Sequence, residues 1–201
     1  MRKLVLSEWV SLDGYTAGPD NDMSFVGESF NEEMGKYEDD IVNTADTLVL
    51  GRVTYESFAG SWPYVPDKPD ASEPEKAYAR KLNAMRKVVF SRTLSTADWN
   101  NSELRREIDP EAVQRWKQQD GKDMLIYGSA SIVQQLTSLG LIDEYQLLVH
   151  PVVLGGGTAL FNDIGDKQRL KLASAKPFRS GVVLLTYERA DRNASGSAGA
   201  G

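Results

Sequence analysis

Short apolar runs alternate with longer amphipathic stretches along most of the chain. Apolar runs bounded by turn residues are typical of buried strands, whereas apolar residues that recur every three or four positions are typical of helices. The apolar runs predict strands at residues 4–10, 47–50, 87–90, 124–127 and 145–149. Because strands that alternate with helices commonly share one sheet, this order of elements favours an α/β fold.

The amphipathic segments predict helices between these strands. Four of them lie at residues 29–44, 52–58, 73–85 and 130–139. A further helix is expected to begin at Pro110, after Asp109 as N-cap, and to end at Gly121. The apolar face of the first helix is predicted to consist of Phe30, Met34, Tyr37, Ile41 and Val42.

The C-terminal part of the chain predicts an antiparallel hairpin, with strands at residues 170–178 and 182–187. Residues 99–108 are ambiguous, and an edge strand is one interpretation. Several prolines between Pro63 and Pro74 should hold that segment in an irregular surface excursion. Residues 190–201 are small and polar, so we expect a disordered tail or a cloning remnant after one domain of residues 1–189.

Composition excludes several classes of chemistry. The chain has 201 residues with no cysteine, which excludes a thiolate metal site, and its single histidine leaves almost nothing for a zinc site or a Ser-His-Asp triad. The net charge of −6 disfavours binding to nucleic acid. The N-terminal segment turns polar before a signal peptide or a membrane span develops, so we expect a cytoplasmic protein. The lack of cysteine and the single histidine lead us to expect no metal site.

Polar and glycine-containing segments follow four of the predicted strands, where open α/β sheets bind their ligands. They are residues 11–15, 51–55, 91–93 and 128–131. A glycine, an arginine and hydroxyls at a helix start suit a phosphate group, because the first N–H groups of a helix and the guanidinium attract anions. Each segment alone is explained equally well as a turn or an N-cap. No GxGxxG pattern follows a strand and no P-loop is present, so another type of dinucleotide fold is required.

The segment Gly51-Arg52-Val53-Thr54-Tyr55-Glu56-Ser57-Phe58 resembles the start of the cofactor-binding helix in dihydrofolate reductases. Further motifs resemble the reductase domain of bacterial riboflavin biosynthesis, and they lie at residues 11–14, 127–131, 140–145, 151–157 and 160–161. The resemblance covers about residues 2–189, with the motifs in the family's order. It implies a three-layer α/β/α fold of the dihydrofolate reductase type, in which a mixed, mostly parallel sheet carries an antiparallel C-terminal strand.

The resemblance also implies a binding site for NADPH. Gly51, Arg52 and Thr54 are expected near the cofactor phosphates, and Ser91 and Arg92 near the adenosine 2′-phosphate. The residues expected around the diphosphate are Gly128, Ser129, Ala130 and Ser131. Two arginines near a 2′-phosphate would favour NADPH over NADH, because NADH lacks that dianion.

The catalytic residues are less determined. The resemblance favours Asp13 of the Ser-Leu-Asp-Gly motif as the carboxylate near the nicotinamide, although a turn residue before Gly14 is the alternative. In dihydrofolate reductases a carboxylate of the first helix serves the substrate, and Glu33, or its neighbour Glu32, is the nearest candidate here. The other carboxylates of that helix, which include Glu38, are predicted mainly to form a solvated face.

The substrate side is expected to include Tyr15, Leu154 and Gly155, with residues 17–19 covering the nicotinamide. His150 is interpreted as structural. Trp62 and Tyr64 either wall a flat heterocycle or pack over the core.

These observations predict a stand-alone, NADPH-dependent reductase of a small heterocyclic substrate, similar to a dihydropterin or to 5-amino-6-(5-phosphoribosylamino)uracil. A non-catalytic NADPH-binding module is the alternative. A zinc deaminase domain, as in bifunctional riboflavin enzymes, would need cysteine ligands that the chain lacks. Family resemblance suggests a homodimer.

Overall fold

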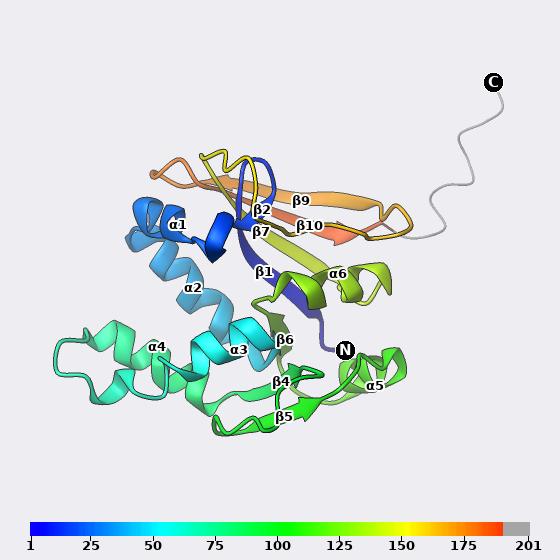
Figure 1. The fold of residues 1–201 in the computed structure, drawn as a ribbon, viewed down its shortest axis with the longest axis horizontal. Coiled ribbons are helices and arrows are strands. Elements are labelled where there is room, and N and C mark those ends of the chain that lie inside the picture. Colours follow the sequence, from blue (N-terminus) through cyan, green and yellow to red (C-terminus); the bar gives the residue numbers. More distant parts are fainter. Residues whose placement is uncertain (191–201) are drawn as a thin grey trace.

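One large sheet organises the computed structural model, which describes residues 1–190 (Figure 1). The predicted tail lies, from residue 191 onward, outside the described residues. The strands of the sheet are β1 (Leu4–Ser11), β3 (Ala45–Gly51), β4 (Arg86–Phe90), β5 (Ser102–Arg105), β6 (Asp123–Ile126), β7 (Glu144–His150), β9 (Leu170–Pro177) and β10 (Val183–Arg189). Their spatial order is β5-β4-β3-β6-β1-β7-β10-β9.

Neighbouring strands from β5 to β7 are all parallel. The C-terminal strand β10 runs antiparallel to β7, and β9 runs antiparallel to β10. The predicted mixed, mostly parallel sheet with an antiparallel C-terminal strand is therefore confirmed. The ambiguous segment at residues 99–108 contains the edge strand β5.

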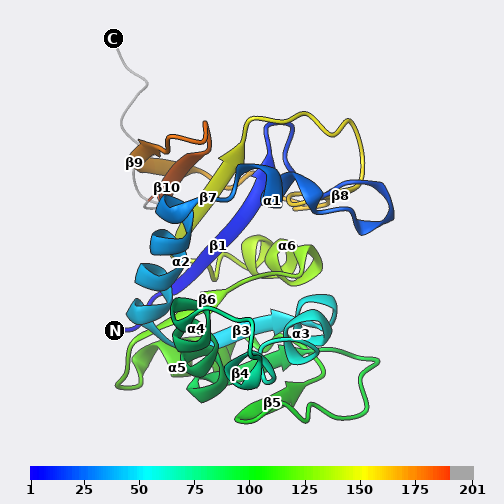
Figure 2. The same ribbon diagram turned by 90° about the vertical axis from the view of Figure 1, so that its left-hand side faces the viewer.

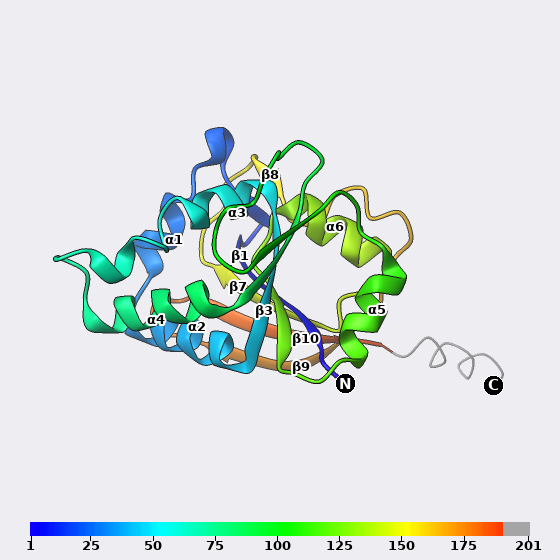
Figure 3. The same ribbon diagram turned by 90° about the horizontal axis from the view of Figure 1, so that it is seen from below.

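Helices cover both faces of the sheet and make three layers (Figure 3). The helices of one face are α2 (Glu32–Thr44), α3 (Arg52–Ala59) and α4 (Glu73–Ala84). Those of the other face are α5 (Pro110–Gln118) and α6 (Ala130–Ser138). Each layer buries its apolar face against alternate residues of the strands: Val5 of β1 packs on the α2 side, and Leu4 and Leu6 pack on the α6 side.

Several short elements lie beyond the carboxyl end of β1 (Figure 2). They are β2 (Tyr15–Ala17), β8 (Thr158–Ala159) and α1 (Ser24–Ser29). β2 and β8 pair as a small antiparallel ribbon. The sequence predicted a loop for this region, and two- or three-residue strands give too short a pattern to be recognised by periodicity.

The predicted start of the first helix at residue 29 is wrong. α2 begins at Glu32, because the Asn31 side chain caps it by accepting a hydrogen bond from the backbone N–H of Met34. Phe30 lies in an extended link between α1 and α2 and is 49% exposed, so it does not belong to the buried face. Helix α5 likewise ends at Gln118, ahead of Gly121, which has a φ of 143° in the following turn.

Residues 63–72 form the predicted irregular excursion, and α4 then begins at Glu73, as predicted. Val65–Asp67 form a short 3-10 helix, and Pro74 occupies the first turn of α4 after Ser72 as N-cap. Within residues 1–190, no helix is both long and apolar enough to cross a membrane.

Candidate cofactor and substrate site

The starts of α3 and α6 lie against each other at the centre of the sheet. The N–H of Gly51 donates to the carbonyl of Gly128 at 2.9 Å. Ser129 Oγ lies 3.3 Å from both the backbone N and the Oγ1 of Thr54. The structure therefore brings together four of the residues predicted for the cofactor phosphates, although they come from segments about 75 positions apart.

Close approach in this cluster depends on glycine. A Cβ on Gly51 would lie 2.7 Å from Ser129 Oγ and 2.9 Å from Ser129 N. Gly128 has a φ of 90°, and a Cβ there would lie 3.1 Å from Thr54 Oγ1. The Gly128–Ser129 peptide bond is cis. A larger residue at Gly51 would force the two helix starts apart, and one at Gly128 would be strained by its positive φ.

Neither helix start carries a side-chain cap of its own. The N-cap of α3 is Gly51, which has no side chain, and the N-cap of α6 is Ser129, whose hydroxyl does not cap its own helix. The first N–H groups of a helix and its macrodipole attract anions. Two such helix starts side by side make this cluster suitable for a phosphate-bearing ligand. Of the other two predicted diphosphate residues, Ala130 is buried and Ser131 is exposed.

The predicted 2′-phosphate residues lie beside α3. Gly51 and Phe90 are register partners, so Ser91 and Arg92 emerge next to Arg52. Ser91 is buried, and its hydroxyl accepts hydrogen bonds from the backbone N–H groups of Thr93 and Leu94. Arg92 is exposed, and Arg52 forms an exposed ion pair with Glu56.

The sequence prediction missed Arg106, whose guanidinium donates to the carbonyls of Ser91 and Leu94. Arg106 follows β5 directly, so its place after a strand was a signal that could have found it. It ties the turn that carries Arg92 to the edge of the sheet.

Asp13 joins two loops. Its carboxylate accepts a hydrogen bond from Ser11 Oγ at 2.6 Å and from the backbone N–H groups of Leu154 and Gly155 at 3.1 and 2.8 Å. These hydrogen bonds lower the pKa of Asp13 to about 2, and the bond from Ser11 has the largest effect. Asp13 is therefore ionised at neutral pH and is not placed to donate a proton, so its geometry fits a role in positioning the loop at 154–155.

This arrangement also changes the expected roles of Leu154 and Gly155, since both of their N–H groups are occupied by Asp13. Tyr15 lies in β2, opposite Ala159 of β8, and its N–H donates to Ser11 Oγ. The loops of Asp13 and Gly155 thus form one connected layer beyond the end of β1.

Substituting alanine for Asp13 is expected to release that layer. The N–H groups of Leu154 and Gly155 lose their acceptor, so their hydrogen exchange should accelerate, while the amides of β1 should exchange as before. Exchange followed by NMR or mass spectrometry measures this. Unchanged exchange at residues 154–155 would show that Asp13 does not hold the loop.

Glu33 is also engaged in a structural contact. Its carboxylate accepts a hydrogen bond from the backbone N–H of Arg179 at 2.8 Å and pairs with the Arg179 guanidinium at 3.3 Å. The backbone bond and the arginine charge lower the pKa of Glu33. Glu33 fastens the start of α2 to the turn between β9 and β10. The prediction that it serves the substrate finds no support in this geometry, and Glu32 is exposed.

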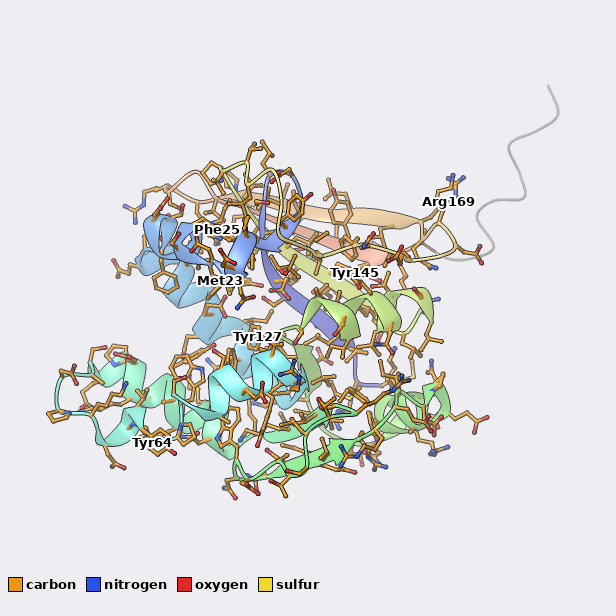
Figure 4. All side chains as sticks on the ribbon, in the orientation of Figure 1. Met23, Phe25, Tyr64, Tyr127, Tyr145 and Arg169 are labelled. Atoms are coloured by element: carbon orange, nitrogen blue, oxygen red, sulfur yellow. The ribbon has the colours of Figure 1, made fainter. Side chains whose placement is uncertain are left out.

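Glu38 corrects the prediction of a solvated carboxylate face. It is 7% exposed and accepts hydrogen bonds from Trp9 Nε1 at 3.0 Å and from Tyr127 Oη at 2.9 Å. Burial raises the pKa of Glu38 to about 7, although these hydrogen bonds oppose the shift. Figure 4 shows Tyr127 in the middle of the molecule, between α2 and α3.

Of the remaining predicted residues, His150 and Trp62 pack against aromatic side chains, whereas Tyr64 is exposed. His150 is fully buried with its ring at 5.1 Å from that of Phe25, and burial lowers its pKa to about 4. Trp62 packs on Phe58 and Tyr78. Tyr64 is 63% exposed and borders a cavity of about 630 Å³ between α3 and residues 96–100.

Known proteins match this chain in sequence and in the arrangement of its strands. The family model of the RibD C-terminal domain matches residues 2–184. The chain belongs to this family. A relative from Bacillus subtilis (strain 168), the uncharacterized protein YyaP, is 33% identical over 186 residues, which is 92% of this chain and 94% of the relative.

Two solved structures share the fold at 14% sequence identity each. One is a diaminohydroxyphosphoribosylaminopyrimidine deaminase/5-amino-6-(5-phosphoribosylamino)uracil reductase from Thermotoga maritima, with a TM-score of 0.64 over 94% of this chain and 57% of that protein. The other is dihydrofolate reductase from Enterococcus faecalis, complexed with NADP(H) and RAB-propyl, with a TM-score of 0.60 over 94% of this chain and 97% of that protein. The dihydrofolate reductase-like fold predicted from the motifs is confirmed.

Proposed function

We propose that the chain binds NADPH at the carboxyl ends of β3, β4 and β6 and reduces a small heterocyclic substrate. The nicotinamide supplies the hydride. The residues of the chain hold the phosphates, orient the two reactants and keep water out. A dihydropterin or a compound like 5-amino-6-(5-phosphoribosylamino)uracil is the proposed substrate class, supported by the family and by the Thermotoga structure of the same fold.

The joined starts of α3 and α6 carry this proposal. The bonds between the two helix N-termini use the N–H groups of Gly51 and Thr54, and the other first N–H groups of α3 and α6 are the proposed donors to a diphosphate, without any lysine in the cluster. The glycines at positions 51 and 128 let the two helix starts approach each other closely, because Ser129 fills the space of a Cβ at Gly51, and Glu8 and Thr54 border it at Gly128. Arg92 and Arg52 at the adjacent strand ends are proposed to bind the 2′-phosphate. Tyr15, Leu154 and Gly155, held by Asp13, are proposed to border the substrate.

Titration of the protein with NADPH and NADH, followed by tryptophan fluorescence, tests the cofactor assignment. NADPH is expected to bind and to be preferred over NADH. An absence of NADPH binding at concentrations far above cellular levels would overturn the proposal.

Arg92→Ala is expected to weaken NADPH binding by roughly 1.5–3 kcal/mol, because a charge-assisted hydrogen bond to the 2′-phosphate is lost. NADH binding should barely change. Arg115→Ala is the matched control, since Arg115 is an exposed arginine of α5 and its ion pairs within residues 1–190 are with acidic residues of its own helix start. An equal loss for both cofactors would remove Arg92 from the 2′-phosphate site.

A binding module without turnover is the second candidate. It is favoured by one observation, namely that Asp13 and Glu33 are both ionised and occupied by contacts within the fold. Loss of NADPH absorbance with dihydrofolate or with the phosphoribosylaminouracil distinguishes the two candidates. Turnover with either compound supports the reductase, and binding of NADPH without turnover supports the module.

The homodimer is also a proposal. Light scattering at micromolar concentration tests it, and a monomer would count against it.

A further inference from the structure

Glu8 occupies the point at which the sheet opens. β1 and β6 pair through Leu6 and Ile126, and beyond this pair β6 ends, whereas β1 continues beside β7 as far as Ser11. Glu8 is the second residue of β1 past the last pair. In an open α/β sheet, ligands bind in the crevice where neighbouring strands diverge in this way. Glu8 is therefore a carboxyl group in the crevice itself.

Its side chain points to the joined starts of α3 and α6. A Cβ on Gly128 would lie 3.1 Å from Glu8 Oε2 and 3.1 Å from Thr54 Oγ1, so this carboxyl oxygen and the threonine hydroxyl flank the same glycine. Alternation along β1 explains the direction, because Leu6 and Val10 also face the α6 side of the sheet. Glu8 thus lies beside Gly128 of the proposed phosphate site, on which Thr54 also borders.

The surroundings of Glu8 favour the neutral acid. α3 faces it with the Thr54 hydroxyl, the turn before α6 faces it with Gly128, and α2 contributes the carboxylate of Glu38. None of the ion pairs within residues 1–190 includes Glu8. Burial raises the pKa of Glu8 to about 8; a hydrogen bond from the backbone N–H of Trp9 opposes this shift, and the charge of Glu38 adds to it. The side chain is only partly buried, so a ligand in the crevice can reach it.

A negative charge at this point would oppose the proposed ligand. A carboxylate and a diphosphate a few ångströms apart repel each other strongly where water is partly excluded. A protonated carboxyl has no net charge and offers an O–H donor to a phosphate, ribose or carboxamide oxygen.

We propose that Glu8 binds NADPH as a neutral carboxylic acid, so that cofactor binding is coupled to the uptake of one proton by Glu8. This inference rests on the proposed function, because it requires the cofactor to lie against Thr54 and Gly128. If Glu8 is ionised in the free protein, the protein takes up one NADPH and one proton from solvent. The proton binds to the Glu8 carboxylate and forms the O–H bond of the acid. No electron transfer is involved.

The pH dependence of NADPH affinity tests the inference. Below about pH 8 the affinity of the wild type should be nearly constant, and above it the affinity should fall up to about tenfold per pH unit. Glu8→Gln keeps the shape of the side chain and cannot ionise, so its affinity should not show this fall. At about pH 9, calorimetry in buffers of different ionisation enthalpy should detect uptake of close to one proton by the wild type.

Glu111→Gln is the control variant, since Glu111 is an exposed residue of α5 and its loss should leave the wild-type fall in affinity. Wild-type binding without proton uptake would overturn the inference, and so would an unchanged fall in Glu8→Gln. The calorimetric measurement needs no variant, so it decides the question even if Glu8→Gln folds poorly. Absence of NADPH binding at every pH would instead overturn the proposed function.

Discussion

Alanine at position 51 is expected to weaken NADPH binding at least about 100-fold, or roughly 2.7 kcal/mol. The added Cβ would lie 2.7 Å from Ser129 Oγ, 2.9 Å from Ser129 N and 3.0 Å from Ser129 Cβ. A side-chain rotation relieves only the first of these contacts, so the backbone of the α3 start must move away from that of the α6 start. Such a shift breaks the hydrogen bond from Gly51 to Gly128 and separates the N–H groups proposed to hold the diphosphate.

Gly35→Ala provides the matched comparison, because the nearest atom to its added Cβ is 3.7 Å away, in ordinary contact, and the residue lies within α2. This change should leave NADPH affinity unchanged and stabilise α2 by roughly 0.5–1 kcal/mol. Fluorescence titration measures both affinities, and thermal unfolding shows whether each variant is folded. A folded Gly51→Ala protein with wild-type affinity would place the cofactor elsewhere.

Much of the fold was predictable, because the predicted elements have strong local signals. The buried strands are short apolar runs, and Asp109-Pro110 is a clear helix start that the structure confirms. The first helix was misplaced because Phe30 fits its apolar spacing, although Asn31 caps the helix one residue later. A helix boundary depends on which residue satisfies the first N–H groups, and the period alone does not reveal this.

The carboxylates were harder to assign because their environments are made by distant residues. Glu38 has acidic neighbours in the sequence and reads as part of a solvated face, but Trp9 and Tyr127 enclose it. Asp13 reads as a candidate acid, and its three donors include two N–H groups more than 140 residues away. Glu8 had a local signal that was overlooked, since it is the one charged residue on the β1 face that otherwise carries Leu4, Leu6 and Val10.

Alanine at position 157 is expected to destabilise the protein by about 3 kcal/mol or more, by backbone strain and overpacking. Gly157 has a φ of 119°, and its added Cβ would lie 2.1 Å from the carbonyl oxygen of Ala17 and 2.6 Å from the carbonyl carbon of Gly18. Both contacts are to backbone, so no side-chain rotation relieves them. The chain before β8 must therefore move away from β2, although Ala17 and Thr158 are register partners in this ribbon.

Gly156→Ala is the control, because its added Cβ has no atom within 4 Å and its φ is not positive. It should change stability by less than about 0.5 kcal/mol. For a chain of this size, Gly157→Ala should lower the melting temperature by roughly 6–12 °C. Hydrogen exchange should also accelerate first at Tyr15–Ala17, because β2 loses its partner before the large sheet opens. If both alanine variants melted at the wild-type temperature, the β2–β8 ribbon would contribute little to the fold, and the layer beyond the end of β1 would be held by Asp13 and by backbone hydrogen bonds such as that from Leu12 to Val152.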